Sequence, residues 1–126
     1  MGGTAGPTEL VVEDDPSLRI LCRVNLELDR YRVLEAANLS RAEEHVRNEA
    51  IDVVLLDLHV GERDGRELLP LLREQQPHAA ICLLSGTSEL DPPQEPDVQA
   101  FIRKPFELEH LTGTIERLLR NEPARP

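Results

Sequence analysis

The stretch VVLLDL, residues 53–58, is apolar except for one acid, Asp57. The chain then turns polar, with Gly61 and an Asp64-Gly65 pair that is typical of a turn. A short apolar run bounded in this way predicts a buried strand. A bare carboxylate at the edge of a core is energetically costly, so Asp57 must be solvated, paired or bound to a metal. The function of the chain therefore depends on which side chains reach the same place.

Short apolar runs alternate with segments of helical character along the rest of the chain. Pro16 suits the first turn of a helix, and Ser40 with Glu43 forms a capping box that predicts the start of a second helix. Asp64 gives a similar signal for a third helix, which Pro70 should kink or shorten. We predict strands at residues 9–12, 31–36, 53–58, 79–86 and 98–102, and helices at residues 16–30, 40–50, 64–76 and 107–120.

Helical periodicity predicts which side chains of the first and last helices face the core. In the first helix these are Leu18, Leu21, Cys22, Asn25 and Leu28, and in the last they are Leu108, Leu111, Ile115, Leu118 and Leu119. Strands that alternate with helices, with inner strands apolar on both sides, predict an α/β fold. We therefore expect a parallel sheet with helices on both faces.

Composition excludes several classes of partner. The chain has 126 residues, enough for one domain, and 40% of them are hydrophobic. Its formal net charge of −10 argues against direct binding of nucleic acid or of an anionic membrane surface. No apolar segment approaches the roughly 20 residues that span a bilayer. Cys22 and Cys82 lie in apolar runs and are expected to be buried and reduced, which favours the cytoplasm. We expect a domain at residues 8–120, a flexible leader at 1–7 and a polar tail at 121–126.

Polar side chains follow the predicted strands at the points where the strands end. Right-handed crossovers bring the carboxyl ends of parallel strands to one edge of the sheet, where such folds bind ligands. Carboxylates gathered there repel one another unless a cation lies between them, and oxygen ligands favour Mg²⁺. A hydroxyl and a lysine suit a phosphoryl group, and an aspartate near Mg²⁺ can attack phosphorus to form an acyl phosphate. The residues at this edge are Glu13, Asp14, Asp15, Asp57, Ser85 and Lys104.

Four motifs in this order, VVEDDPSLR, VVLLDL with the later DG, CLLSG and FIRKPF, resemble the receiver domain of two-component response regulators. The resemblance covers residues 8–120, nearly the whole chain. Each motif alone is weak, and their order at strand ends makes the combination specific. The resemblance implies a five-stranded flavodoxin-like sheet with strand order 2-1-3-4-5. It also implies that a histidine kinase or a histidine phosphotransfer protein phosphorylates an aspartate with Mg²⁺, and that an output domain or protein reads the changed surface.

The resemblance further implies that Asp57 is the phosphoacceptor. Asp14 would bind Mg²⁺ directly and Glu13 through water, with Asp15 as the neighbouring acid. His59 would offer its backbone carbonyl to the metal. Asp57 would then end a buried strand because that rigid position aims it at the metal and at the incoming phosphorus. Taken alone, Asp57 could instead cap a helix, and the EDD run could be a solvated turn.

The same resemblance implies roles for residues at the last two strands. Ser85 matches the hydroxyl that bonds a phosphoryl oxygen, and Lys104 matches the lysine that pairs with the phosphate, with a cis peptide bond to Pro105. Phe101 takes the place of an aromatic switch residue. Taken alone, Ser85 would be a turn residue, Lys104 a surface lysine and Phe101 a core residue. The side chain of His59 could tune hydrolysis of the acyl phosphate or point outward.

The sequence also departs from the family. The segment from Ser85 to Lys104 is short, and its prolines (Pro92, Pro93 and Pro96) should leave the fourth helix degraded or missing, because an interior proline costs a helix about 3 kcal/mol. A phosphoaccepting receiver remains the favoured function, with only self-phosphorylation and autodephosphorylation at Asp57 as enzymatic activity. The alternative is a degenerate receiver that acts as a phosphorylation-independent protein-interaction module. A phosphohydrolase is the least favoured, since His59 stands where such enzymes carry a second acid.

Overall fold

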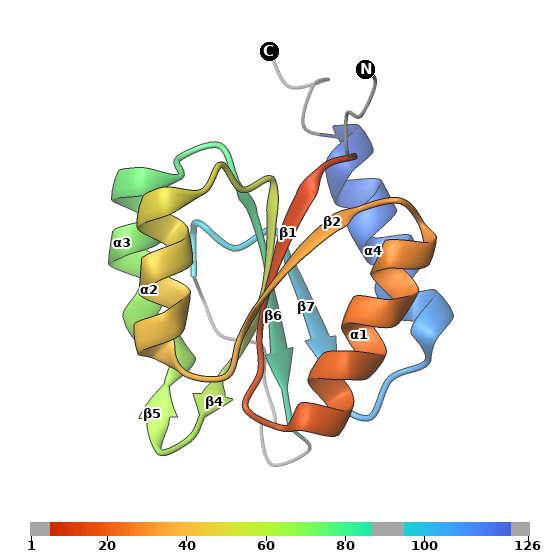
Figure 1. The fold of residues 1–126 in the computed structure, drawn as a ribbon, viewed down its shortest axis with the longest axis horizontal. Helices are drawn as coiled ribbons and strands as arrows, with labels where there is room; N and C mark the ends of the chain where they lie inside the picture. Colours follow the sequence, from red (N-terminus) through yellow and green to blue (C-terminus); the bar gives the residue numbers. More distant parts are fainter. Residues whose placement is uncertain (1–5, 87–94, 122–126) are drawn as a thin grey trace.

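A five-stranded sheet crosses the middle of the molecule (Figure 1). The computed structural model describes residues 6–86 and 95–121, so most of the predicted leader and tail lie outside the described part. The strands are β1 Thr8–Val12, β2 Arg32–Ala36, β3 Val53–Asp57, β6 Ala80–Ser85 and β7 Ala100–Arg103. They are parallel and lie in the order β2-β1-β3-β6-β7. Counted along the chain among these five strands, that order is 2-1-3-4-5, so the predicted topology is confirmed.

Helices cover both faces of this sheet (Figure 1). They are α1 Pro16–Leu28, α2 Leu39–Asn48, α3 Leu69–Gln75, α4 Leu108–Asn121 and the short 3-10 helix η1 Gly65–Leu68. Val11 of β1 packs with side chains of α1 and α4 on one face, whereas Leu10 and Val12 pack with α2 and α3 on the other. The strand side chains alternate in this way because successive residues of a strand point to opposite faces. No helix in the described ranges is long and apolar enough to cross a membrane.

A small hairpin that the sequence did not predict follows β3. Strand β4, His59–Val60, pairs antiparallel with β5, Arg63–Asp64. Gly61 supplies the turn with a positive φ of 64°, a conformation that glycine adopts without steric cost. The hairpin therefore keeps residues 59–64 close to the carboxyl end of β3.

The cap of α2 corrects one sequence prediction. Asn38, not Ser40, is the N-cap, and its Oδ1 accepts a hydrogen bond from the backbone N–H of Arg41 at 2.8 Å. Ser40 and Glu43 lie inside the helix, so the predicted capping box is wrong. Asparagine satisfies the first free N–H groups of a helix as well as serine does. The sequence pattern alone therefore cannot decide which of two capping residues, two positions apart, begins the helix.

The predicted third helix is divided into two elements. Asp64 accepts a hydrogen bond from the backbone N–H of Arg66 at 2.8 Å and caps η1, which leads directly into α3. Pro70 lies in the first turn of α3, where a helix needs no bond from its missing N–H. The proline therefore shortens the α-helix, and the preceding turn takes the tighter 3-10 form.

The face of α1 that meets the core agrees with the prediction only in part: Cys22 is buried and Leu18 packs against the same core, as predicted. Cys22 and Leu26 are its buried residues, while Leu21 and Leu28 are 44% and 74% exposed. Apolar side chains surround most of this helix, so periodicity alone could not select the buried stripe. The stripe predicted on the last helix is confirmed at its centre, where the buried apolar residues are Leu111, Ile115 and Leu118.

The connection from β6 to β7 is described at residue 86 and at residues 95–99. Among the described residues of this connection there is a turn and no helix, as predicted. Val98 packs against the core on the α2–α3 side, and Arg73 of α3 makes ion pairs with Glu95, at 3.8 Å, and with Asp97. The prediction of a loop at residues 87–94 lies outside the described residues.

Candidate functional site

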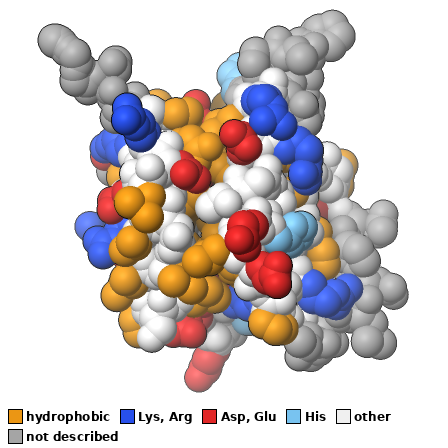
Figure 2. All heavy atoms as spheres, turned by 90° about the vertical axis from the view of Figure 1, so that its right-hand side faces the viewer, with side chains coloured by type: hydrophobic (Ala, Val, Ile, Leu, Met, Phe, Trp, Pro, Cys, Tyr) orange, Lys and Arg blue, Asp and Glu red, His pale blue; other side chains and the backbone are white. Residues whose placement is uncertain are grey.

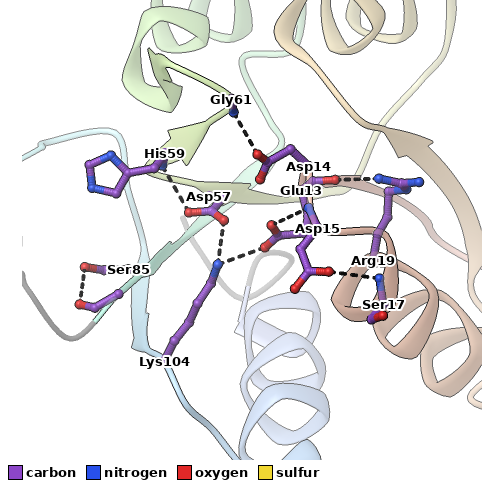
Figure 3. A network of polar contacts seen from close by, with 11 residues as sticks. Glu13, Asp14, Asp15, Ser17, Arg19, Asp57, His59, Gly61, Ser85 and Lys104 are labelled. Atoms are coloured by element: carbon purple, nitrogen blue, oxygen red, sulfur yellow. Dashed lines mark hydrogen bonds and ion pairs between the residues drawn. The ribbon is translucent and has the colours of Figure 1, made fainter.

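Four adjacent strands bring polar side chains to one edge of the sheet (Figure 3). Glu13 follows β1 and Asp57 is the last residue of β3. Ser85 is the last residue of β6, and Lys104 follows β7. Asp14, next to Glu13, lies at the start of the loop into α1. Residues that the sequence placed in four separate motifs are therefore close together in the fold.

Lys104 pairs with both buried acids of this cluster. Its Nζ lies 2.9 Å from Oε1 of Glu13 and 2.5 Å from Oδ2 of Asp57. Glu13 and Asp57 are only 1% and 3% exposed, because each ends or follows a strand in the interior of the sheet. Two buried carboxylates thus share one ammonium group, which leaves an excess of negative charge at the edge of the core.

The electrostatics of the pair follow from burial and from this shared partner. Burial, and then the neighbouring Asp57, raise the pKa of Glu13 from 4.5 to about 7, while Lys104 and the backbone N–H of Asp15 act in the opposite direction. Burial lowers the pKa of Lys104, but the two carboxylates outweigh it and the pKa is raised overall. The ammonium is therefore held charged, and it does not fully compensate the acids beside it.

Backbone N–H groups hold the carboxylates in place. Oδ1 of Asp57 accepts a hydrogen bond from the N–H of His59 at 3.0 Å, and Oδ2 of Asp14 accepts one from the N–H of Gly61 at 3.0 Å. The hairpin after β3 therefore fixes an acid from each of two strands (Figure 3). These two hydrogen bonds orient the carboxylate oxygens through the backbone of the hairpin.

Three carboxylates of the cluster fit a divalent cation. One oxygen each from Glu13, Asp14 and Asp57 lies within 4.8 Å of the others. Two of these residues are buried and Asp14 is exposed, so the group opens to solvent on one side. Hard oxygen donors without sulfur or imidazole suit Mg²⁺ better than zinc or copper. The donor set agrees with the metal expected from the sequence.

Ser85 lies in the predicted place with its hydroxyl turned toward its own loop. The side chain is buried, and Oγ donates to the carbonyl of Gly86 at 3.2 Å (Figure 3). Phe101 is half-buried against the core on the α2–α3 side, with the guanidinium of Arg103 5.6 Å from the centre of its ring. The peptide bond between Lys104 and Pro105 is cis.

Two residues that support the site were not singled out from the sequence. A Cβ added to Gly65 would lie 1.9 Å from the backbone carbonyl oxygen of Asp57, so only glycine fits there. The Asp64-Gly65 pair indicates a turn and the start of a helix, but the sequence pattern does not reveal that Gly65 lies against the backbone of Asp57. Arg19 of α1 donates to the carbonyl of Glu13 at 2.9 Å, and nothing in the sequence distinguishes it from Arg23, the other arginine of this helix.

A receiver domain is defined by this strand order together with an acidic cluster and a lysine at the carboxyl edge of the sheet. The chain belongs to the response regulator receiver domain family, whose family model matches residues 10–116. The family expected from the four sequence motifs is thus confirmed.

Individual relatives agree with this assignment. Sporulation initiation phosphotransferase F of Bacillus subtilis is 27% identical over 113 residues, which cover 87% of this chain and 91% of that protein. The KDP operon transcriptional regulatory protein KdpE of Escherichia coli is 32% identical over 117 residues, or 91% of this chain and 52% of that protein. The non-phosphorylated HemR receiver domain from Leptospira biflexa has a TM-score of 0.79 and 31% identity, covering 90% of this chain and 94% of that one. The chain therefore spans nearly all of the first relative and about half of KdpE.

Proposed function

We propose that this chain accepts a phosphoryl group on Asp57 from the phosphohistidine of a histidine kinase or a histidine phosphotransfer protein. One observation carries the proposal: the Asp57 carboxylate ends β3 inside a cluster of two further acids and the ammonium of Lys104. A transferring phosphoryl group needs fixed positive charge and a metal site around it. We expect the reaction to occur in the cytoplasm, and an output domain or partner protein to read the product.

The transfer is a displacement at phosphorus. A carboxylate oxygen of Asp57 donates an electron pair to phosphorus, the P–N bond to the donor imidazole breaks, and the nitrogen keeps the bonding pair. Asp14, Asp57 and the backbone carbonyl of His59 would hold Mg²⁺ directly and Glu13 would hold it through water, and the ion would offset the negative charge of the reacting groups. The cluster supplies the acceptor and the metal ligands from one edge of the sheet.

The product changes the charge of the site. A phosphoryl group adds nearly two negative charges to Asp57. We expect Lys104 to pair with a phosphoryl oxygen, and the hydroxyl of Ser85 to exchange its bond with Gly86 for one with the same group. Phe101 would then change its rotamer as the adjacent ends of β6 and β7 adjust. These movements would alter the surface that an output partner contacts.

The test is the intact mass of the chain after incubation with acetyl phosphate and Mg²⁺. We expect an added mass of one phosphoryl group that is absent without Mg²⁺ and absent in Asp57→Ala. The matched control Glu62→Ala, an exposed acid in the same hairpin, should be labelled like the unchanged chain. The proposal would be contradicted if Mg²⁺ binds but the chain gains no mass and beryllofluoride causes no spectral change. That result would favour an interaction module.

The donor would dock beside the site, along α1. A cavity of about 580 Å³ next to Lys104 is lined by side chains of α1 and of the segment after β7, among them Leu21 and Phe106. Apolar side chains continue from it along α1 (Figure 2), where the exposed large hydrophobic residues are Ile20, Leu21, Val24 and Leu28. An apolar surface that borders a reactive aspartate suits a partner that must approach closely to transfer its phosphoryl group.

Replacing Leu21 with glutamate tests this docking surface. Transfer from a phosphohistidine donor should fall at least about tenfold relative to labelling by acetyl phosphate, because a charge is placed in the apolar contact. Leu28→Glu makes the same change on the same helix, away from the cavity beside Lys104, and should have the smaller effect. Equal losses with both phosphoryl sources would contradict docking at this position.

A further inference from the structure

Glu9 is a buried acid that the site does not use. It lies on β1, paired with Val33 of β2 on one side and with Val53 of β3 on the other. Its side chain is 0% exposed, and neither of its carboxylate oxygens has a hydrogen-bond partner among residues 6–86 and 95–121. Because strand residues alternate, Glu9 points to the same face as Val11, toward α1 and α4. The site lies at the opposite end of the same strand.

The surroundings of Glu9 do not offset a negative charge. The charged groups that raise its pKa are Asp29, after α1, and Asp52, before β3, and both are acids. Asp52 is already occupied, since its Oδ2 accepts a hydrogen bond from the backbone N–H of Thr8 at 2.8 Å. The charge of Glu9 also acts on the thiols of Cys22 and Cys82 and on the phenol of Tyr31. Of the charged groups on α4, Arg117 acts on Cys82, and Glu116 and Arg120 act on Tyr31. The arginines of α1, Arg19 and Arg23, pair with Glu35 of β2.

An ionised carboxylate without any partner is far less stable in such a position than a neutral carboxyl. We propose that Glu9 is a proton-binding site of the folded state, which holds its proton while β1 is covered by α1 and α4 and releases it when the chain unfolds. The step is a simple acid dissociation: the O–H bond breaks, the carboxylate keeps the electron pair, and water accepts the proton. This inference is independent of the proposed phosphorylation.

Folding stability should then depend on pH in a defined direction. Burial, followed by Asp29 and Asp52, raises the pKa of Glu9 from 4.5 to about 8. Between these two values the folded chain keeps a proton that the unfolded chain has lost. Stability from this group is therefore complete below pH 4.5 and falls as the pH rises toward 8, by up to about tenfold in the folding constant per pH unit.

The comparison of the unchanged chain with Glu9→Gln isolates this group, because glutamine keeps the shape of the neutral acid and does not titrate. We expect the ratio of their folding constants, measured by urea unfolding, to shift in favour of the variant by roughly a hundredfold between pH 5.5 and pH 8.5. The matched control Glu27→Gln changes an exposed acid on α1 and should follow the pH dependence of the unchanged chain. A ratio that is independent of pH would overturn the proposal.

A direct titration covers the case in which Glu9→Gln does not fold. The ¹³C chemical shift of the Glu9 side-chain carboxyl in the folded unchanged chain should move with a midpoint near 8. A midpoint near 4.5 would show that the carboxyl is ionised inside the fold at neutral pH and would overturn the proposal.

Discussion

Replacing Lys104 with methionine should lower the free energy of unfolding by about 3 kcal/mol at neutral pH in the absence of divalent metal, since removing one partner leaves buried charge uncompensated. Methionine keeps most of the length of the side chain and loses the ammonium that Glu13 and Asp57 share. The value is at the lower end for buried ion pairs because the Lys104 side chain is itself 24% exposed. Urea unfolding in EDTA measures the difference directly.

The loss in Lys104→Met should be smaller in acid. Burial and Asp57 raise the pKa of Glu13 to about 7 even though Lys104 acts to lower it, so without the ammonium the variant should hold a proton on Glu13 at neutral pH. An acid with a raised pKa makes the fold less stable as the pH rises through and above its ordinary value of 4.5. The two chains should therefore converge near pH 5 and diverge at pH 7.5. Lys104→Arg keeps the charge and should retain most of the stability at both pH values, and an equal loss in both variants at every pH would contradict this account.

Much of the fold could be predicted because its signals are local. The four strands that carry the site are short apolar runs with a polar residue at or just after their end, and right-handed crossovers then determine at which edge those ends meet. That is why the sequence alone predicts that Asp57, Ser85 and Lys104 lie at the carboxyl edge of the sheet. Lys104 is also the only lysine in the sequence, against thirteen arginines, which is a second local signal that this position is special.

The remaining features depend on tertiary packing. The buried stripe of α1 is set by how the helix rests on the sheet, and its sequence offers apolar residues in almost every direction. Glu9 lies in an ordinary-looking strand segment, ELVV. Only the fold shows that the charged groups acting on its carboxyl, Asp29 and Asp52, are both acids. The direction of the Ser85 hydroxyl depends on one rotamer, which no pattern of residue types can encode.

Replacing Gly65 with alanine should destabilise the fold by more than about 3 kcal/mol, because the added methyl group would overlap the backbone of Asp57. The Cβ would lie 1.9 Å from the carbonyl oxygen and 3.0 Å from the carbonyl carbon of that residue. Neither atom is the end of a flexible side chain, so the clash can be relieved only if β3 or η1 moves. Urea unfolding measures the cost, with Gly113→Ala as the control.

The control separates the effect of contact from that of glycine itself. A Cβ at Gly113, within α4, meets no atom within 4 Å, so alanine there should stabilise the chain by about 0.5–1 kcal/mol through its higher helix propensity.

Gly65→Ala should in addition slow labelling of Asp57 by acetyl phosphate, since the N–H of Gly65 also donates to the carbonyl of Leu58 at 2.7 Å. A stable Gly65→Ala variant with unchanged labelling would show that the start of η1 does not hold the acceptor in place. Loss of both properties would mean that the turn after the hairpin positions Asp57 as firmly as the sheet does.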